Sequence, residues 1–354
     1  MKIKKLDIAV TNLCNHKCKN CFIWETYKDG SLSVKSEVSL RQYQDFFMKH
    51  NFWTNLAFTG GEPFLRKDFT DIVKSAIDIC PKLKMFSMNT NGYSTKLIVK
   101  NVKEILKFSK GKEFHIRISL DGNEAFHDDS RGLKLAYVNA LKTFKALKSL
   151  GNRKFSVGLE YTISSYNEGK LKEFMEENSF SPDDIILTVA QESYRYANPA
   201  IAHKEKENPE NITAIPVENT GHMLLDQIAN STTESVPKVR PNDDLTKQDV
   251  KYFLSRLRPK SVLNVGQWTF LQHYLNDIKI PCVAGKDTFH ADPFGDINLC
   301  TLIEEKVGNI KTNYLTEREE YITDCNCYTP CESYYGLAAN KTKSVFRALA
   351  ASTT

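Results

Sequence analysis

Cys14-Asn15-His16-Lys17-Cys18-Lys19-Asn20-Cys21 is the stretch that decides the fold, because it places three thiols within eight residues at the spacing C-x3-C-x2-C. Thiolates are soft ligands that suit iron–sulfur clusters or zinc. A structural zinc site would need a fourth ligand close by, and the imidazole of His16 is poorly placed to turn back to a metal held by its neighbours. Three ligands on one tight loop instead leave one iron of a cubane cluster open. We therefore predict that Cys14, Cys18 and Cys21 hold a cluster whose open iron binds a substrate-like molecule.

A second motif, Phe58-Thr59-Gly60-Gly61-Glu62-Pro63, follows about forty residues after the cysteine loop. Glycines let backbone carbonyls approach an ammonium group closely, and the carboxylate of Glu62 adds a countercharge. Alone, this motif would be read as an ordinary turn. Its meaning therefore depends on the cysteine loop that precedes it.

The two motifs together resemble the radical S-adenosylmethionine (SAM) superfamily. The resemblance implies an enzyme in which the three cysteines hold a [4Fe–4S] cluster and the open iron is chelated by SAM. One electron would cleave SAM to methionine and a 5′-deoxyadenosyl radical, which would abstract a hydrogen from the substrate. The electron would come from a reductant such as flavodoxin or ferredoxin.

The resemblance also implies a set of SAM contacts. Gly60, Gly61 and Glu62 would bind the amino group, Asn91 belongs to a Thr-Asn-Gly turn that often lies close to SAM, and Ser119 begins a Ser-Leu-Asp-Gly turn. Ile163, at the end of a later strand, would contact the adenine. Two alternatives stay open: the Asn-Gly pair is also an ordinary turn, and a strand isoleucine is often simply buried.

The segment His127-Asp128-Asp129-Ser130-Arg131-Gly132 resembles a motif of the superfamily branch that carries additional C-terminal clusters. Arg131 could clamp a carboxylate of a ligand. It could equally pair with Asp121 or Asp128 and hold the loop, and this structural role is the one we favour.

Composition limits the possible function. The chain has 354 residues, nine cysteines and a net charge of +5 without a long basic run, so a nucleic-acid partner is not indicated and an anionic substrate is allowed. No apolar run approaches the length of a transmembrane helix, and the apolar part of the N-terminus is too short for a signal peptide. We expect a cytoplasmic protein with reduced thiols. An open iron is oxygen-sensitive, which implies an anaerobic or well-reduced setting.

Strand patterns alternate with helix patterns through the first half of the chain, and this predicts a parallel sheet with right-handed crossovers. Six such units match the partial (β/α)6 TIM-like barrel of the superfamily, over about residues 5 to 195. Strands are expected at residues 5–10, 55–58, 84–88, 115–120, 154–163 and 185–190, and helices at 40–49, 68–80, 102–108, 135–150 and 171–177. In the helix at 135–150, the core side is assigned to Val138, Leu141, Phe144 and Leu147. Cys80 is expected to be buried rather than a ligand.

Three parts of the chain are predicted: a radical SAM core at 1–197, a connecting insertion with helices at 198–270, and a small auxiliary-cluster domain with a terminal helix at 271–354. The insertion has no clear period until a helix at 247–257. The polar and aromatic residues 191–196 are either substrate contacts or a solvated loop.

The C-terminal part resembles the SPASM/twitch extension of radical SAM enzymes, in which a C-x(n)-G-x4-C pattern supplies two ligands of an auxiliary iron–sulfur cluster. The matching pattern here is Cys282 followed by Gly295 to Cys300, and it precedes Cys325, Cys327 and Cys331. Five cysteines suffice for one four-ligand cluster with one to spare. We therefore favour a single auxiliary [4Fe–4S] cluster with Cys282 and Cys300 as the safer ligands. A thiolate zinc site is the rival interpretation.

The substrate is not named by the sequence. One candidate is a small polyol, amino sugar or glycan precursor, which the short extension and the single auxiliary cluster slightly favour. The other is a peptide, as in many SPASM relatives, although no N-terminal leader-recognition module is seen. From a different class, the chain could be a non-catalytic iron–sulfur or zinc binding protein.

Overall fold

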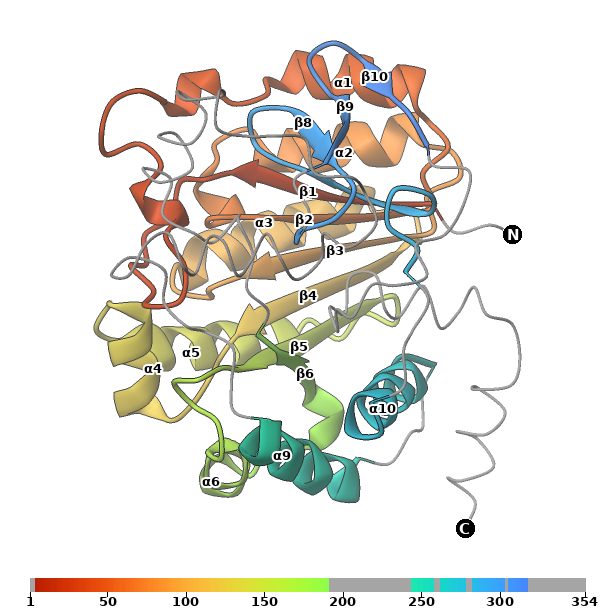
Figure 1. Cartoon of the computed structure of the whole chain (residues 1–354). Helices are drawn as coiled ribbons and strands as arrows, with labels where there is room; N and C mark the ends of the chain where they lie inside the picture. The colour runs from red at the N-terminus through yellow and green to blue at the C-terminus, as the bar shows by residue number, and fades with distance from the viewer. Residues whose placement is uncertain (1–3, 191–242, 258–261, 278–281, 303–304, 318–354) are drawn as a thin grey trace, which may run out of the picture.

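The computed structural model of this chain describes residues 4–190, 243–257, 262–277, 282–302 and 305–317 (Figure 1). Within these residues, ten strands form one sheet in the order β10-β9-β8-β7-β1-β2-β3-β4-β5-β6. Each of the strands β1 to β6 is parallel to its neighbour. These six strands are β1 (Lys5–Thr11), β2 (Asn55–Gly60), β3 (Met85–Thr90), β4 (Glu113–Ser119), β5 (Phe155–Ile163) and β6 (Ile185–Val189).

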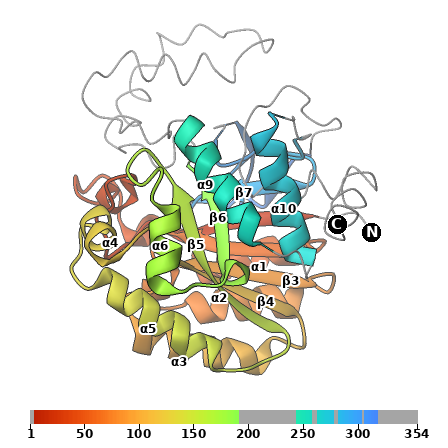
Figure 2. The same cartoon turned by 90° about the horizontal axis from the view of Figure 1, so that it is seen from below.

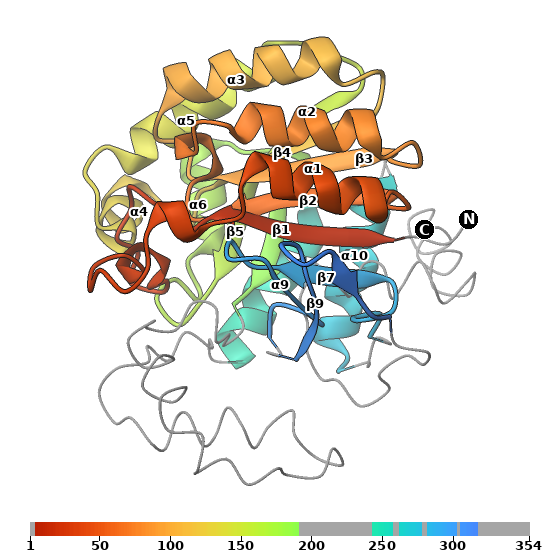
Figure 3. The same ribbon diagram turned by 90° about the horizontal axis from the view of Figure 1, so that it is seen from above.

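Helices connect these strands in turn, which confirms the predicted partial (β/α)6 barrel. They are α1 (Leu40–Lys49), α2 (Phe69–Ile79), α3 (Thr95–Phe108), α4 (Glu124–Arg131), α5 (Ala136–Lys148) and α6 (Leu171–Asn178). Helices α1, α2, α3 and α5 lie in a layer over one face of the sheet (Figure 3). Local sequence sets their ends: Ser39 and Gln42 form a reciprocal capping box at the start of α1.

The hydrophobic core lies between this face and the helices. Alternate strand residues point into it, so that β3 and β4 show a strict alternation of buried and partly exposed side chains. Phe86, Phe114 and Phe155 occupy directly paired positions on three neighbouring strands. Their ring centroids are 4.7 Å and 4.8 Å apart. Such paired aromatic residues help to fix the strand register.

The other face of the sheet, which we call the polar face, carries the remaining side chains. Asn89 and Arg117 are paired across β3 and β4, and Glu160 on β5 pairs with Ser119. On β1, the buried Lys5 and Asp7 form an ion pair of 2.7 Å. A buried charge is tolerated only when it is paired or hydrogen-bonded, and these residues satisfy that condition.

The C-terminal strands continue the same sheet beyond β1. Strand β7 (Thr288–Ala291) is parallel to β1, whereas β8 (Asp296–Asn298), β9 (Lys306–Asn309) and β10 (Tyr314–Leu315) follow in antiparallel order. The turn between β7 and β8 is built on Asp292, whose Oδ1 accepts hydrogen bonds from the backbone amides of Phe294, Gly295 and Asp296. The segment Asp-Pro-Phe-Gly therefore forms a tight turn.

Helices α9 (Asp243–Arg256) and α10 (Val262–Leu275) lie near β6, with α9 beside α6 (Figure 2). The carboxylate of Asp249 accepts a hydrogen bond of 2.7 Å from the amide of Gly169, and the side-chain amide of Gln267 donates to the carbonyl of Ile185 at 3.1 Å. None of the described helices is long and apolar enough to cross a membrane.

Several sequence-based expectations about elements were wrong. Helix α4 was not predicted, because its polar sequence lacks an apolar stripe. Helix α3 begins at Thr95 rather than at residue 102, since Ile98 is part of its buried side. Val138 was assigned to the core side of α5 but is 43% exposed, and Ala140 lies in the core instead. An alanine fits where helix and sheet approach closely, and a pattern that favours large apolar residues overlooks it.

Candidate functional site

The motifs found in the sequence come together at one edge of the sheet. The cysteine loop follows β1, the Gly-Gly-Glu-Pro turn ends β2, the Thr-Asn-Gly turn ends β3 and the Ser-Leu-Asp-Gly turn ends β4. Because these strands are parallel and adjacent, their carboxyl ends meet at one place, which is where parallel α/β barrels carry their chemistry. We call this place the loop edge.

The thiol of Cys18 lies close enough to Cys14 and Cys21 to raise the pKa of each. Burial is the main cause: it raises the pKa of Cys14 to about 11, with a further contribution from Cys18. Burial, followed by the charges of Cys18 and Cys14, raises the pKa of Cys21 to about 12. Bare thiolates are therefore unfavourable here. A cationic iron centre would stabilise the thiolate form of all three cysteines. Thiolates are soft ligands, so these residues fit a [4Fe–4S] cluster.

His16 is buried within this loop and packs edge-on against Tyr93, with ring centroids 5.8 Å apart. Burial lowers its pKa to about 3, with the charge of Arg131 acting in the same direction. The imidazole is therefore neutral.

The two glycines of the Gly-Gly-Glu-Pro turn are required for a reason that the sequence did not suggest. A Cβ atom on Gly60 would lie 2.2 Å from the carbonyl oxygen of Thr11, and one on Gly61 would lie 2.4 Å from that of Leu13. The amides of Gly61 and Glu62 donate to these same two carbonyls, at 2.7 and 2.8 Å. The turn after β2 thus packs directly on the backbone that leads into the cysteine loop.

The carboxylate of Glu62 is buried and joins two motifs. It accepts hydrogen bonds from the Thr90 hydroxyl at 2.8 and 2.9 Å, from the Asn91 amide at 2.8 Å and from the Phe64 amide at 3.2 Å. Burial nevertheless raises its pKa to about 7. An ammonium group near this carboxylate would lower its pKa and so favour the negatively charged form.

Asn91 continues this network into the cysteine loop. Its side-chain amide donates to Oδ1 of Asn15 at 2.8 Å, and its own Oδ1 accepts from the amide of Tyr93 at 3.0 Å. Gly92 has a φ of +73°, a conformation that favours glycine. The Thr-Asn-Gly turn is therefore tied to both the preceding motifs.

The pairing that we favoured for Arg131 is confirmed: its guanidinium forms an ion pair with Asp121. The carboxylate of Asp128, the other proposed partner, accepts hydrogen bonds from the backbone amides of Leu135 and Tyr137 at 2.6 and 2.9 Å.

Two predicted SAM contacts occupy different environments. Ser119 ends β4 and is partly exposed on the polar face. Ile163 is completely buried in the hydrophobic core, and its carbonyl accepts a hydrogen bond from the Ala190 amide at 2.7 Å. Their contacts with SAM stay predictions.

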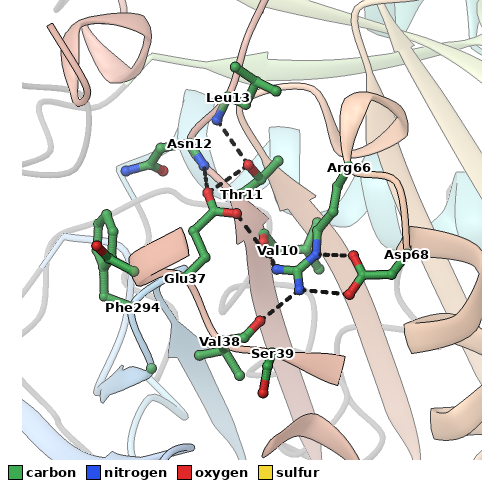
Figure 4. Close-up of polar contacts among 12 residues, drawn as sticks. Val10, Thr11, Asn12, Leu13, Glu37, Val38, Ser39, Arg66, Asp68 and Phe294 are labelled. Carbon is green, nitrogen blue, oxygen red and sulfur yellow. Dashed lines mark hydrogen bonds and ion pairs between the residues drawn. The ribbon is translucent and has the colours of Figure 1, made fainter. Parts of the chain in front are cut away.

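Sequence reasoning missed a buried network behind the cysteine loop (Figure 4). The Glu37 carboxylate accepts from the Thr11 hydroxyl at 2.6 Å and the Asn12 amide at 2.9 Å, and it also accepts from the Tyr27 hydroxyl. Arg66, which follows the Gly-Gly-Glu-Pro motif closely, donates to the carbonyls of Val10 and Val38 at 2.6 Å each. An arginine beside a known motif was a usable signal, whereas Glu37 gave none.

Cys282, Cys300 and Ala284 form a small buried cluster, against which the partly buried Leu302 packs. The role of the two cysteines as ligands stays a prediction. The thiol of Cys300 accepts a hydrogen bond from the Leu302 amide at 3.3 Å. Cys80 is fully buried at the end of α2, as expected. Cys325, Cys327, Cys331 and residues 191–196 lie outside the described residues.

Comparison with known proteins identifies related sequences. Residues 8–177 match the model of the radical SAM superfamily. Pre-heme d1 synthase from Dinoroseobacter shibae is 30% identical over 169 residues, which cover 47% of this chain and 38% of that protein. GTP 3',8-cyclase from Vibrio parahaemolyticus is 31% identical over 122 residues, which cover 34% of each protein. The chain thus matches well under half the length of these curated relatives.

A solved structure shares the fold over a longer range. That of anSMEcpe with bound AdoMet and Kp18Cys peptide aligns with a TM-score of 0.53 at 15% identity, covering 87% of this chain and 77% of that chain. This likeness shows a shared fold.

The fold is a parallel partial barrel with three cysteines on the loop that follows its first strand. Residues 8–177 form a radical SAM domain, and proteins of that superfamily use a [4Fe–4S] cluster and SAM. The predictions of this family, its enzyme class and its cofactors are confirmed at the level of the superfamily.

Replacing Gly61 by Ala should destabilise the loop edge, because the new Cβ would meet the Leu13 carbonyl. We expect a loss of stability of about 1–3 kcal/mol and a lower iron content after anaerobic reconstitution. Gly266→Ala is the matched control: nothing lies within 4 Å of its Cβ position, and alanine favours a helix by up to about 1 kcal/mol. Equal thermal midpoints and iron contents in the two variants would contradict this account.

Glu62 should make the cofactor-free protein less stable as the pH rises. An unfolded glutamate titrates near 4.5 and the folded one near 7, so in this window the folded chain binds a proton that the unfolded chain has released. Stability should therefore fall between pH 4.5 and 7, by up to about 3 kcal/mol. Urea unfolding at pH 5 and pH 7.5 measures the change, and Glu62→Gln should reduce it. The same pH dependence in both proteins would refute the assignment.

Proposed function

We propose that this chain is a radical SAM enzyme whose cluster is held by Cys14, Cys18 and Cys21 and whose SAM is held by residues of the loop edge. Once reduced by an external donor, a cluster held there would supply the one-electron chemistry of SAM cleavage and of hydrogen abstraction from the substrate. The observation that carries the proposal is the meeting of the three-cysteine loop with Gly60, Gly61, Glu62 and Asn91 at one sheet edge. Ser119 and Ile163 complete the proposed SAM contacts.

The residues of the loop edge have separate tasks in this proposal. The carboxylate of Glu62 forms an ion pair with the ammonium group of SAM. The Asn91–Asn15 hydrogen bond of 2.8 Å holds the Thr-Asn-Gly turn at a fixed position relative to the cysteine loop. The backbone contacts of Gly61 and Glu62 with β1 prevent the turn from moving away. Positioning of this kind is the protein's main contribution when a cofactor performs the chemistry.

The polar face supports a small, hydroxyl-rich or charged substrate. Arg117 and Glu160 lie 3.7 Å apart there, and the side-chain amide of Asn89 donates to Glu160 at 2.9 Å. The side chains of Arg117 and Glu160 are 22% and 15% exposed to solvent. Polar groups that are already oriented by one another suit a substrate such as a polyol, an amino sugar or a glycan precursor.

We further propose an auxiliary [4Fe–4S] cluster at Cys282 and Cys300, completed by two of Cys325, Cys327 and Cys331. The pairing of β7 with β1 supports a position away from the loop edge: β7 begins opposite Lys5, and β8 returns toward the same level. The cysteine loop follows Thr11 at the other end of β1. The two thiol groups are thus separated by roughly one strand length, about 20 Å. A substrate on the polar face would lie between them, and an electron left after hydrogen abstraction could pass to the auxiliary cluster.

Replacement of Cys14, Cys18 or Cys21 by Ala should abolish SAM cleavage, since two thiolates cannot hold the cluster. The measurement is 5′-deoxyadenosine released by the anaerobically reconstituted full chain with dithionite. Cys80→Ala should retain it, because Cys80 is buried in the core far from the loop. Product from the ligand variants, or none from the wild type, would reject the proposal. A wild type that held only zinc would instead be a binding protein.

The same assay with deuterated compounds identifies the substrate class. A deuterated polyol or amino sugar should transfer label to 5′-deoxyadenosine, whereas label transferred only from peptides would favour a peptide-modifying enzyme. Reduced flavodoxin or ferredoxin can replace dithionite in this assay, which tests the proposed physiological reductant. A cytoplasmic location also stays a prediction.

The double change Cys282→Ala with Cys300→Ala should remove one cluster, about four irons per chain, and spare the SAM-cleaving cluster. Iron and sulfide analysis of the reconstituted protein measures the loss. Cys80→Ala serves as the control for the removal of a buried thiol. An unchanged iron content in the double variant would rule out the auxiliary cluster at these residues.

A further inference from the structure

Arg131 approaches the thiol group of Cys18. Its Nη1 lies 3.8 Å from Cys18 Sγ, within hydrogen-bonding distance for sulfur, and its Nη2 donates to Asp121 Oδ2. The guanidinium is largely buried, with 15% of the side chain exposed. Both ends of the planar group are therefore engaged at the same time, one with a carboxylate and one with a proposed cluster ligand.

The backbone around Arg131 fixes this contact. The amide of Lys17 donates to the Arg131 carbonyl at 3.0 Å, and the amide of Lys19 donates to the Ser130 carbonyl at 2.9 Å. The end of α4 is thus attached to the cysteine loop on both sides of Cys18. Gly132 makes the approach possible, because it has a φ of +61° and a Cβ there would lie 2.6 Å from the Lys17 carbonyl.

Asp121 holds the guanidinium from the other side. Its Oδ1 accepts a hydrogen bond of 3.0 Å from the Thr162 amide, its own amide donates to His127 Nδ1 at 3.2 Å, and its carbonyl accepts from the Asn167 side chain at 2.9 Å. The carboxylate is therefore anchored to the ends of β4 and β5. Arg131 cannot swing toward another partner without breaking this ion pair.

We propose that Arg131 is a positioning residue that donates a charged hydrogen bond to the Cys18 thiolate and thereby raises the reduction potential of the SAM-cleaving cluster. The proposal rests on the proposed function, because it takes Cys18 as a cluster ligand. Reduction adds one negative charge to the cluster, and a buried cation beside a ligand sulfur stabilises the reduced form more than the oxidised form. Hydrogen bonds to cluster sulfurs are a recognised determinant of potential.

The other cations of the loop differ from Arg131 in exposure. Lys19 pairs with Asp129 at 2.6 Å, with the two side chains 49% and 67% exposed. The charge of Lys19 is screened by solvent. Lys19→Met is therefore a matched control, since it removes one positive charge from the same loop without removing a hydrogen bond to sulfur.

The test is a redox titration of the reconstituted full chain, with dithionite as the one-electron donor and EPR detection of the cluster signal that responds to SAM. Arg131→Met should shift the reduction equilibrium of that cluster toward the oxidised form by on the order of tenfold, about 59 mV lower for a one-electron couple. Arg131→Lys keeps the positive charge but cannot contact Asp121 and Cys18 through two separate guanidinium nitrogens, so a smaller shift of the potential is expected. Lys19→Met should leave the potential unchanged.

Asp121→Asn tests the proposal from the opposite direction and is available if the arginine variants fail to fold. Loss of the countercharge should raise the potential, because the guanidinium is then less neutralised. An unchanged potential in Arg131→Met or, failing that variant, in Asp121→Asn would overturn the proposal. So would an unchanged potential with a higher KM for SAM, which is the signature of a clamp on the SAM carboxylate. A wild type without a SAM-responsive cluster would overturn the proposed function as well, so the two failures are distinguishable.

Discussion

The structure depends on the close packing of two chain reversals, one after β1 and one after β2. Gly60 and Gly61 bring the second reversal onto the carbonyls of Thr11 and Leu13, where no side chain fits. This contact sets the distance between the three thiols and the buried carboxylate of Glu62. Because that carboxylate also accepts the amide of Asn91, one packing contact determines the relative positions of three motifs. The role of these glycines is therefore steric within the protein, in addition to any role toward a ligand.

Much of this arrangement could be predicted from the sequence, because local patterns determine it. The alternating strands, the helix stripes and the Ser39 cap are short-range signals, and parallel connectivity then requires that the motifs meet at one edge. The pairing of Cys282 with Cys300 followed from resemblance. What could not be predicted are contacts between residues distant in sequence. Cys18 and Arg131 are 113 positions apart, and nothing in the short polar segment of α4 indicates that its end reaches Cys18.

Electrostatics explains why the unpredicted residues are arginines and carboxylates. Burial of thiols and of Glu62 disfavours their charged forms, so the loop edge must receive positive charge from cofactors or from the protein. Arg131 supplies it on the α4 side. On the other side, Arg66 lies 3.7 Å from Glu37 and 2.7 Å from Asp68, so it is compensated within its own network. Arg131 is also paired, with Asp121, but its other guanidinium nitrogen approaches Cys18 Sγ at 3.8 Å, whereas Arg66 binds backbone carbonyls.

The Glu37 network also connects the loop edge to the C-terminal strands. Val38, whose carbonyl binds Arg66, donates its own amide to the Pro293 carbonyl at 2.8 Å. Strand β1 is at the same time paired with β2 on one side and β7 on the other. The cysteine loop and the segment bearing Cys282 and Cys300 are therefore attached to opposite ends of one buried strand. A sheet that is paired on both sides resists local displacement, because movement would break hydrogen bonds on two strands at once. Two clusters built on such a strand would keep a fixed separation, and electron transfer and substrate placement between them both require that.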